Sequence, residues 1–243
     1  MEQAMLSPTA NRQVELYPNA PWYFALAVVV TWVSFSRSYF AHLRENDIYH
    51  HLHGAFVGTW TVLLIIQPIL YRRRQLQLHR RLGWAGAIIL VPGILLGGAK
   101  MMQMMIQGQA TYPPGIVYQL SFIDATSLFL FPLFLGLSLR YGRRLPLHAR
   151  YMACTILVVL PPAITRLLFF IPWFDSFGKS LNGSFVVIEL ILFVLIADDK
   201  RNHGRIWQPY PLALLLFGLL HLKMNYAGNW QWWHELMDRF AGL

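Results

Sequence analysis

Two histidines occupy matching places in the chain, each at the start of an apolar run that follows a basic loop. His79 lies in the segment 76–81 (LQLHRR), and His148 lies in the segment 145–150 (LPLHAR). Neutral imidazoles that face each other across a helical core can be the axial ligands of a b-type haem. The pattern therefore indicates haem b bound by His79 and His148. The alternative is that both are ordinary interfacial residues at helix starts.

A second group of possible ligands combines histidine with carboxylates. His50 and His53 are three residues apart at the start of an apolar run, so they share one face of a helix. Asp124 and Glu189 lie in later apolar runs at a similar expected depth. Because mixed nitrogen and oxygen ligands suit Fe, Mn or Zn, the four residues predict a divalent metal site. Alternatively, the histidines only mark an interfacial helix start.

Two basic residues, Lys100 and Arg166, also lie within apolar runs. Ionisable residues in membrane spans are costly and are functional candidates for that reason. We expect Lys100 and Arg166 to balance charge or to hold an anionic group. In the structural alternative, Asp124–Arg166 and Lys100–Glu189 ion pairs hold the helices together.

Seven apolar runs carry these residues. They cover residues 21–35, 52–71, 82–107, 116–139, 151–173, 184–197 and 209–226. About twenty helical residues cross the hydrocarbon core, so the first, sixth and seventh runs need flanking residues to span it. The sequence predicts an all-α, polytopic transmembrane bundle of about seven spans.

Charge in the loops predicts the orientation of this bundle. Lys and Arg gather in the segments 72–81, 140–150 and 198–208. The positive-inside rule then places these loops and the N-terminus in the cytoplasm and the C-terminus outside. We expect one membrane domain over residues 1–243, with a cytoplasmic tail (1–20), a bundle (21–226) and an interfacial Trp-rich tail (227–243) that forms a short helix on the membrane.

Composition agrees with a membrane location. Hydrophobic residues make up 56% of the 243 residues and charged residues 13%, whereas soluble domains have roughly 25% charged residues. The net charge of +9 sits mostly in short loops, which favours anionic lipid headgroups over nucleic acid as partners. The single cysteine, Cys154, excludes a disulfide framework or an Fe–S site within the chain.

Pairs of glycines in the apolar runs indicate close approach of other groups. Two pairs have the GxxxG spacing, which is typical of tight helix packing, and one pair follows His79, where a flat macrocycle or another helix could approach. The pairs are Gly54 and Gly58, Gly93 and Gly97, and Gly83 and Gly86.

The segments 51–54 (HLHG), 67–68 (QP) and 78–84 (LHRRLGW) resemble a group of bacterial integral membrane proteins without an assigned activity. That resemblance implies a multi-pass protein of the bacterial cytoplasmic (inner) membrane. More distantly, the chain is similar to cytochrome b561-type bundles, in which paired histidines from four helices hold two haems. His79 and His148 would match one such pair. The second pair fails because only Asp124 faces His53, which leaves one haem or a metal site.

These patterns together predict a membrane protein that binds haem b or a metal ion and acts in redox chemistry on a quinol or lipid-like substrate. The expected partners are the bilayer, a quinone and other membrane subunits. One alternative is a non-enzymatic transporter or channel-like protein whose buried charges line a path. Another is an accessory subunit of a larger membrane complex. The sequence leaves open whether the protein is an enzyme.

Overall fold

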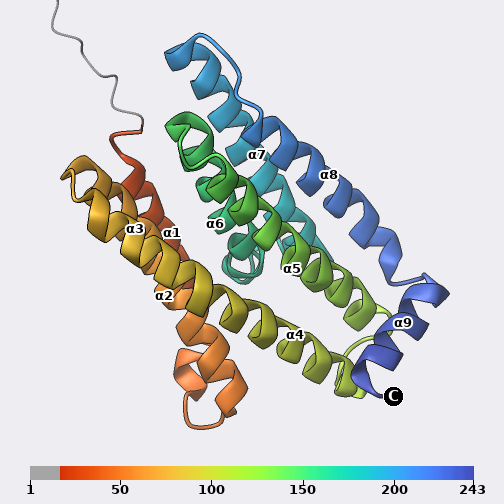
Figure 1. Ribbon diagram of the computed structural model, residues 1–243. Helices are drawn as coiled ribbons and strands as arrows, with labels where there is room; N and C mark the ends of the chain where they lie inside the picture. Colours follow the sequence, from red (N-terminus) through yellow and green to blue (C-terminus); the bar gives the residue numbers. More distant parts are fainter. Residues whose placement is uncertain (1–16) are drawn as a thin grey trace, which may run out of the picture.

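The computed structural model describes residues 17–243, and in this part every regular element is a helix. The main helices are α1 (Ala20–Ser34), α2 (Ile48–Arg72), α3 (Leu76–Ala85), α4 (Val91–Gln107), α5 (Ile116–Arg140), α6 (Leu145–Leu168), α7 (Phe177–His203), α8 (Pro209–Ala227) and α9 (Gln231–Ala241). The short ones are η1 (Phe40–His42), η2 (Gly86–Leu90) and η3 (Gln109–Thr111). The predicted all-α class is confirmed (Figure 1).

Five helical segments of the described chain are long and apolar enough to cross a membrane. They are Ile48–Arg72, Leu76–Gln107, Ile116–Arg140, Leu145–Leu168 and Phe177–His203. α1 is a shorter apolar helix, and α8 packs along α7. A helix pairs the N–H and C=O groups of its own backbone by hydrogen bonds, which a lipid environment requires because it offers no water. The fold is therefore that of an integral membrane protein. The count of seven spans and their orientation stay predictions.

Helix ends differ from the ends of the apolar runs. α7 spans Phe177–His203, whereas the apolar run predicted only 184–197. Its start is set by Ser176, whose side chain accepts a hydrogen bond from a backbone N–H, and its end by Gly204 in the left-handed conformation. Polar residues therefore extend the helix at both ends. Other predicted starts also move outward, to Ile48 for α2, Leu76 for α3 and Leu145 for α6.

The third predicted span contains a wide turn. α3 and α4 are joined through η2, a π-helical turn over Gly86–Leu90, and together form one long segment (Figure 1). Pro92 follows directly in the first turn of α4. Proline supplies no backbone N–H, and a π-helical turn lets the helix continue past the missing hydrogen bond.

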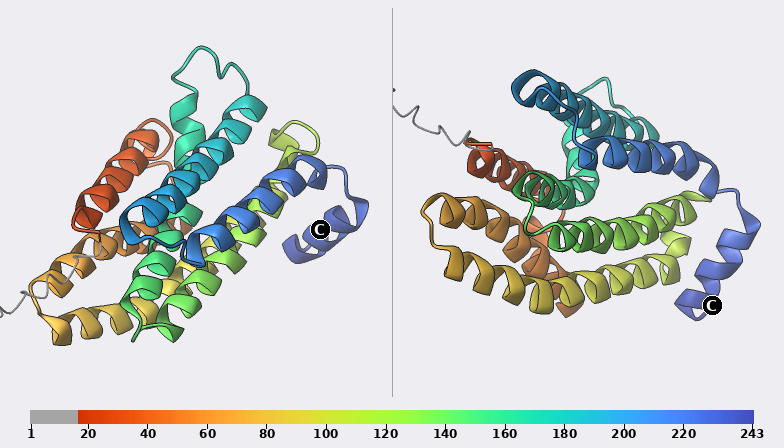
Figure 2. Two further views of the ribbon diagram at one scale, coloured as in Figure 1. Left: turned by 90° about the horizontal axis from the view of Figure 1, so that it is seen from above. Right: turned by 45° about the horizontal axis from the view of Figure 1, so that its top comes forward.

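The helices form two rings that share two members. In the first ring, α1 packs on α2, α2 on α4, α4 on α5, α5 on α6, and α6 back on α1. In the second ring, α5, α6, α7 and α8 pack around one another (Figure 2). α6 belongs to both rings, and 61% of its apolar window is buried against 17–33% in the other candidate spans. α6 is therefore the central helix of the molecule.

Aromatic packing fills the first ring. The ring of Trp60 on α2 lies 5.3 Å from the ring of Phe131 on α5, edge to face. Its Nε1 donates a hydrogen bond to the hydroxyl of Thr155 on α6 at 3.4 Å. A buried indole with a partner for its N–H is the favourable arrangement. Trp60 thus joins three helices of the first ring.

The glycines of α4 receive side chains from α2. A Cβ added to Gly93 would lie 2.6 Å from the ring of Phe56, and one added to Gly97 would lie 2.8 Å from Nδ1 of His53. The GxxxG pair of α4 is therefore a packing surface. Gly58, in the pair on α2, has nothing within 4 Å of such a Cβ.

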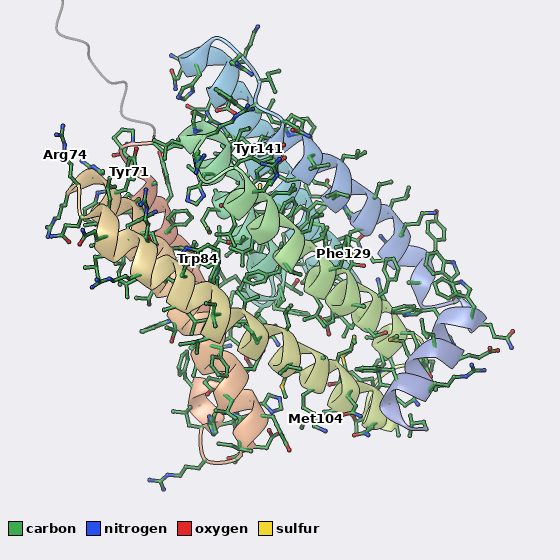
Figure 3. The ribbon with its side chains drawn as sticks, viewed as in Figure 1. Tyr71, Arg74, Trp84, Met104, Phe129 and Tyr141 are labelled. Carbon is green, nitrogen blue, oxygen red and sulfur yellow. The ribbon has the colours of Figure 1, made fainter. Side chains whose placement is uncertain are left out.

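The two ends of the bundle are distinct. Tyr71, Arg74 and Tyr141 lie at one end (Figure 3), which also holds Tyr17 because its hydroxyl bonds to Asp199 near the end of α7. We call this the basic end, since the loops 73–75, 141–144 and 204–208 meet there. Most of the predicted tail 1–20 lies outside the described residues. The side of the membrane on which the basic end lies is a prediction.

α9 covers the opposite end, the one that holds Met104 in Figure 3. Its residues Trp233, Met237 and Ala241 are buried against α4 and α5. Trp232 and Leu236, on another face, are exposed. A short helix in the tail 227–243 is confirmed, and its location on a membrane surface stays a prediction.

Candidate functional site

The structure brings His79 and His148 together at the basic end. Each lies in the first turns of its helix, α3 or α6, and the ring centroids are 6.3 Å apart with an interplanar angle of 69°. Nδ1 of His79 lies 3.3 Å from the backbone oxygen of Gln67, and Nδ1 of His148 lies 3.0 Å from that of Ser138. Because a carbonyl only accepts, Nδ1 carries the proton in both rings, and Nε2 is left with a free lone pair.

Buried polar atoms without partners lie in the same region. Both polar atoms of the Gln67 side chain are buried and lack a hydrogen bond within the described residues, as does the hydroxyl of Tyr151 on α6. The ring of Tyr71 lies 6.0 Å from that of His79. Since buried polar groups are nearly always bonded in folded proteins, these atoms are candidates for a hydrogen bond to a further group.

The His79–His148 pair would offer a haem two imidazole donors from two different helices. A carbonyl that receives Nδ1–H is also the usual support of a metal-bound histidine. Gly83 and Gly86 do not form the slot for the macrocycle, because added Cβ atoms there would meet Gln67 and Leu63 of α2. Gly83 and Gly86 instead allow α2 to approach closely.

His50 and His53 lie on α2 but in different surroundings. Nδ1 of His50 is 2.7 Å from a carboxylate oxygen of Asp47, at the exposed start of the helix. His53 packs against Gly97 and Gly98 of α4, and its buried Nδ1 has no hydrogen-bond partner within the described residues. The two rings therefore do not belong to one group of metal ligands.

Glu189 has a partner that the sequence reasoning missed. Its carboxylate lies 2.9 Å from Nδ1 of His221 on α8, and Nε2 of His221 lies 3.1 Å from the side-chain oxygen of Asn182. Asn225 donates to the same oxygen at 2.9 Å. The group forms a polar clamp between α7 and α8. The only available signal was an acid and a histidine in consecutive apolar runs.

The two basic residues also take other partners than expected. Lys100 donates to Gln103 at 2.9 Å and lies 5.3 Å from the ring of Tyr49. The Lys100–Glu189 pair of the structural alternative is therefore wrong. Arg166 and Asp124 interact electrostatically between α6 and α5, without the close contact of an ion pair.

The four expected metal ligands consequently do not form one cluster. In residues 17–243, the one group of three or more possible ligands with suitable spacing is Asp198, Asp199 and His203 at the basic end. Asp199 is already committed to an ion pair with Arg150. Among the predicted ligand residues, the structure thus brings together only the His79–His148 pair.

The Arg150–Asp199 pair is fully buried at the basic end. Nε of Arg150 donates to both carboxylate oxygens at 3.0 and 2.9 Å, and the hydroxyl of Tyr17 donates to one of them at 2.8 Å. Burial raises the pKa of Tyr17 above its usual value, so the phenol stays protonated and donates. Sequence reasoning counted Arg150 as a solvent-exposed loop charge.

No protein-family model matches the chain, and no curated protein and no solved structure matches it either. The resemblance to cytochrome b561-type bundles and to bacterial inner-membrane proteins therefore stays a prediction from the residue pattern. Function has to be argued from the geometry of the chain's own residues.

Proposed function

We propose that this protein binds one b-type haem at the basic end, with His79 and His148 as axial ligands, and takes part in membrane redox chemistry on a quinol or lipid-like substrate. The observation that carries the proposal is the pair of neighbouring imidazoles, in edge-to-face contact, whose Nδ1 atoms are both turned to backbone carbonyls. This leaves a free Nε2 on each ring.

The surrounding residues support a haem more than an isolated metal ion. Two imidazoles alone give an ion only two protein ligands, whereas a macrocycle supplies the other four. Arg80, Arg81, Arg143 and Arg144 lie in or beside the loops of the basic end, where they can pair with the carboxylates of a haem. When bound, the haem would supply one-electron transfer. The chain's own role is to hold it, orient it and exclude water.

The first test of the haem site is the absorption spectrum of protein made with added haem precursor and purified in detergent. We expect a Soret band and α and β bands, with one haem per chain. His79→Ala or His148→Ala should abolish these bands, because each removes one axial ligand. His42→Ala is the matched control, since the exposed side chain of His42 bonds only to the nearby Glu45 among the described residues.

A colourless wild-type protein that also fails to bind added haem would exclude the haem site. Retention of the full spectrum in both alanine variants would exclude these two residues as its ligands. Reduction of the bound haem by a quinol in proteoliposomes would then test the proposed substrate class, with a bacterial inner-membrane location as the expected setting.

A further inference from the structure

An open hollow lies at the opposite end of the bundle, where the end of α1 meets the end of α6. It encloses about 180 Å³ and is lined by Ser34, Arg37, Ser38, Arg166, Phe169 and Phe170. Two arginines, two serines and two phenylalanines therefore line one small space, and they come from segments far apart in the chain.

Each arginine lies over an aromatic ring of the other segment. Cζ of Arg37 is 4.6 Å from the ring centroid of Phe170, and Cζ of Arg166 is 4.4 Å from that of Phe35. Nη1 of Arg166 also donates to the backbone oxygen of Pro162 at 2.8 Å. Cation–π contacts restrain long side chains that would otherwise be mobile. Both positive charges are therefore held beside the hollow.

Acidic groups do not neutralise this pair of charges. Among residues 17–243, neither Arg37 nor Arg166 forms an ion pair. Asp124 attracts Arg166 from α5, and Asp175 in the following loop is paired with Lys179. One carboxylate thus offsets two guanidinium groups, and the hollow keeps a positive charge.

We propose that this hollow binds the phosphate group of a phosphate ester. Arginine presents several N–H donors in a planar fork that matches phosphate oxygens, and the hydroxyl of the exposed Ser38 can add another. Exposed Phe169, Ile171 and Trp173 stand beside it, as is typical of residues at the membrane–water interface, where lipid phosphates lie. A lipid headgroup and a soluble phosphate ester share this chemistry. The proposal is independent of the haem, which would lie at the other end.

Two phosphate probes and one carboxylate probe test the site on the full chain, freed of lipid in a neutral detergent. Native mass spectrometry measures binding of phosphatidylglycerol, and calorimetry measures binding of inorganic phosphate and of acetate. Binding of phosphatidylglycerol alone would identify a lipid headgroup as the source, and binding of inorganic phosphate would identify a soluble ester. Binding of neither probe, or binding of acetate as tight as that of phosphate, would overturn the proposal.

Substitutions show whether the hollow is the binding site. We expect Arg37→Gln to weaken phosphate binding about tenfold or more, because a charge-assisted hydrogen bond is lost. Arg44→Gln removes the same charge from an exposed residue outside the hollow and should change binding less than about twofold. Arg166→Gln alone would leave Asp124 without its countercharge and could destabilise the fold. The contribution of Arg166 to binding is therefore measured in the double variant Arg166→Gln/Asp124→Asn, which removes both charges. Unchanged binding in Arg37→Gln and in the double variant would overturn the proposal.

Discussion

The histidines of this chain differ in what their ring nitrogens contact. His221 has both nitrogens engaged, one with Glu189 and one with Asn182. His50 turns Nδ1 to a carboxylate at an exposed helix start. His79 and His148 instead turn Nδ1 to backbone carbonyls, which leaves Nε2 free at the basic end of the bundle. Residue type alone did not separate these cases, whereas hydrogen-bond partners do.

The repeated context of His79 and His148 made that pair predictable from the sequence. Similar segments at the starts of two helices place similar side chains at the same end of a bundle. The partners of His50, His53, Asp124 and Glu189 were not predictable, because a shared depth does not fix which helix faces meet. Glu189 therefore faces His221 rather than His53 or Lys100. Such partner choices depend on helix rotation, which hydropathy does not reveal.

Asp47 gives a prediction at the scale of one residue. Burial alone would raise the pKa of its carboxyl, but hydrogen bonds from the backbone N–H and ring of His50 and the N–H of Tyr49 lower it. A lowered folded-state pKa adds stability that is present above the unfolded-state value, near 4, and is lost as the pH falls through the folded-state value. We expect the stability of the wild type to fall below about pH 4.

The control for Asp47 is Asp47→Asn, which keeps a capping oxygen but cannot titrate in this range. The difference in thermal midpoint between the wild type and Asp47→Asn should shrink or reverse as the pH falls below about 4. Asp47→Ala should cost about 1 kcal/mol at neutral pH, because α2 loses its cap. A pH-independent difference between the wild type and the Asn variant would contradict the assignment.

At the scale of the elements, close approach of α2 and α4 depends on two glycines of α4. The GxxxG spacing predicted packing for both pairs, yet only the pair on α4 receives side chains at both positions. Spacing cannot show which face of a helix has a neighbour. Likewise, the apolar runs predicted that α7 exists but not its true ends, which Ser176 and Gly204 determine.

Gly93→Ala should destabilise the protein by about 1–3 kcal/mol, because the added Cβ would lie 2.6 Å from the ring of Phe56. Gly58→Ala is the matched control, since its Cβ would meet nothing within 4 Å. We expect that variant to be neutral or more stable by roughly 0.5–1 kcal/mol, because alanine is the better helix former. Unfolding in mixed detergent micelles measures both, and equal effects would contradict the packing role of Gly93.

At the scale of the whole molecule, the all-α class and the membrane architecture followed from hydropathy, whereas the two rings did not. Closure of the first ring needs α1 to meet α6, and no local pattern encodes that contact. The buried ion pair of Arg150 and Asp199 was equally hidden, since both residues lie in segments that look like charged loops. This pair and Tyr17 join α6, α7 and the segment before α1.

Arg150→Gln should lower the free energy of unfolding by about 3–5 kcal/mol, because Asp199 would stay buried without its countercharge. The double variant Arg150→Met/Asp199→Leu should recover most of this loss, since apolar side chains can replace a buried ion pair. Denaturant titration of the purified protein compares the three. A double variant as unstable as the single one would show that the charges themselves hold the basic end together.

The closing contact of α1 with α6 also bears on how the chain is made. Phe35, just after α1, meets Arg166 only when α6 has left the ribosome, and 134 residues separate the ends of these helices. At about 5–20 residues per second, synthesis of that stretch takes roughly 7–27 s. During this interval the face of α1 that later packs on α6 lacks that partner. The hollow between α1 and α6 therefore cannot form until α6 has been made, and α7, α8 and α9 are still to follow at that point.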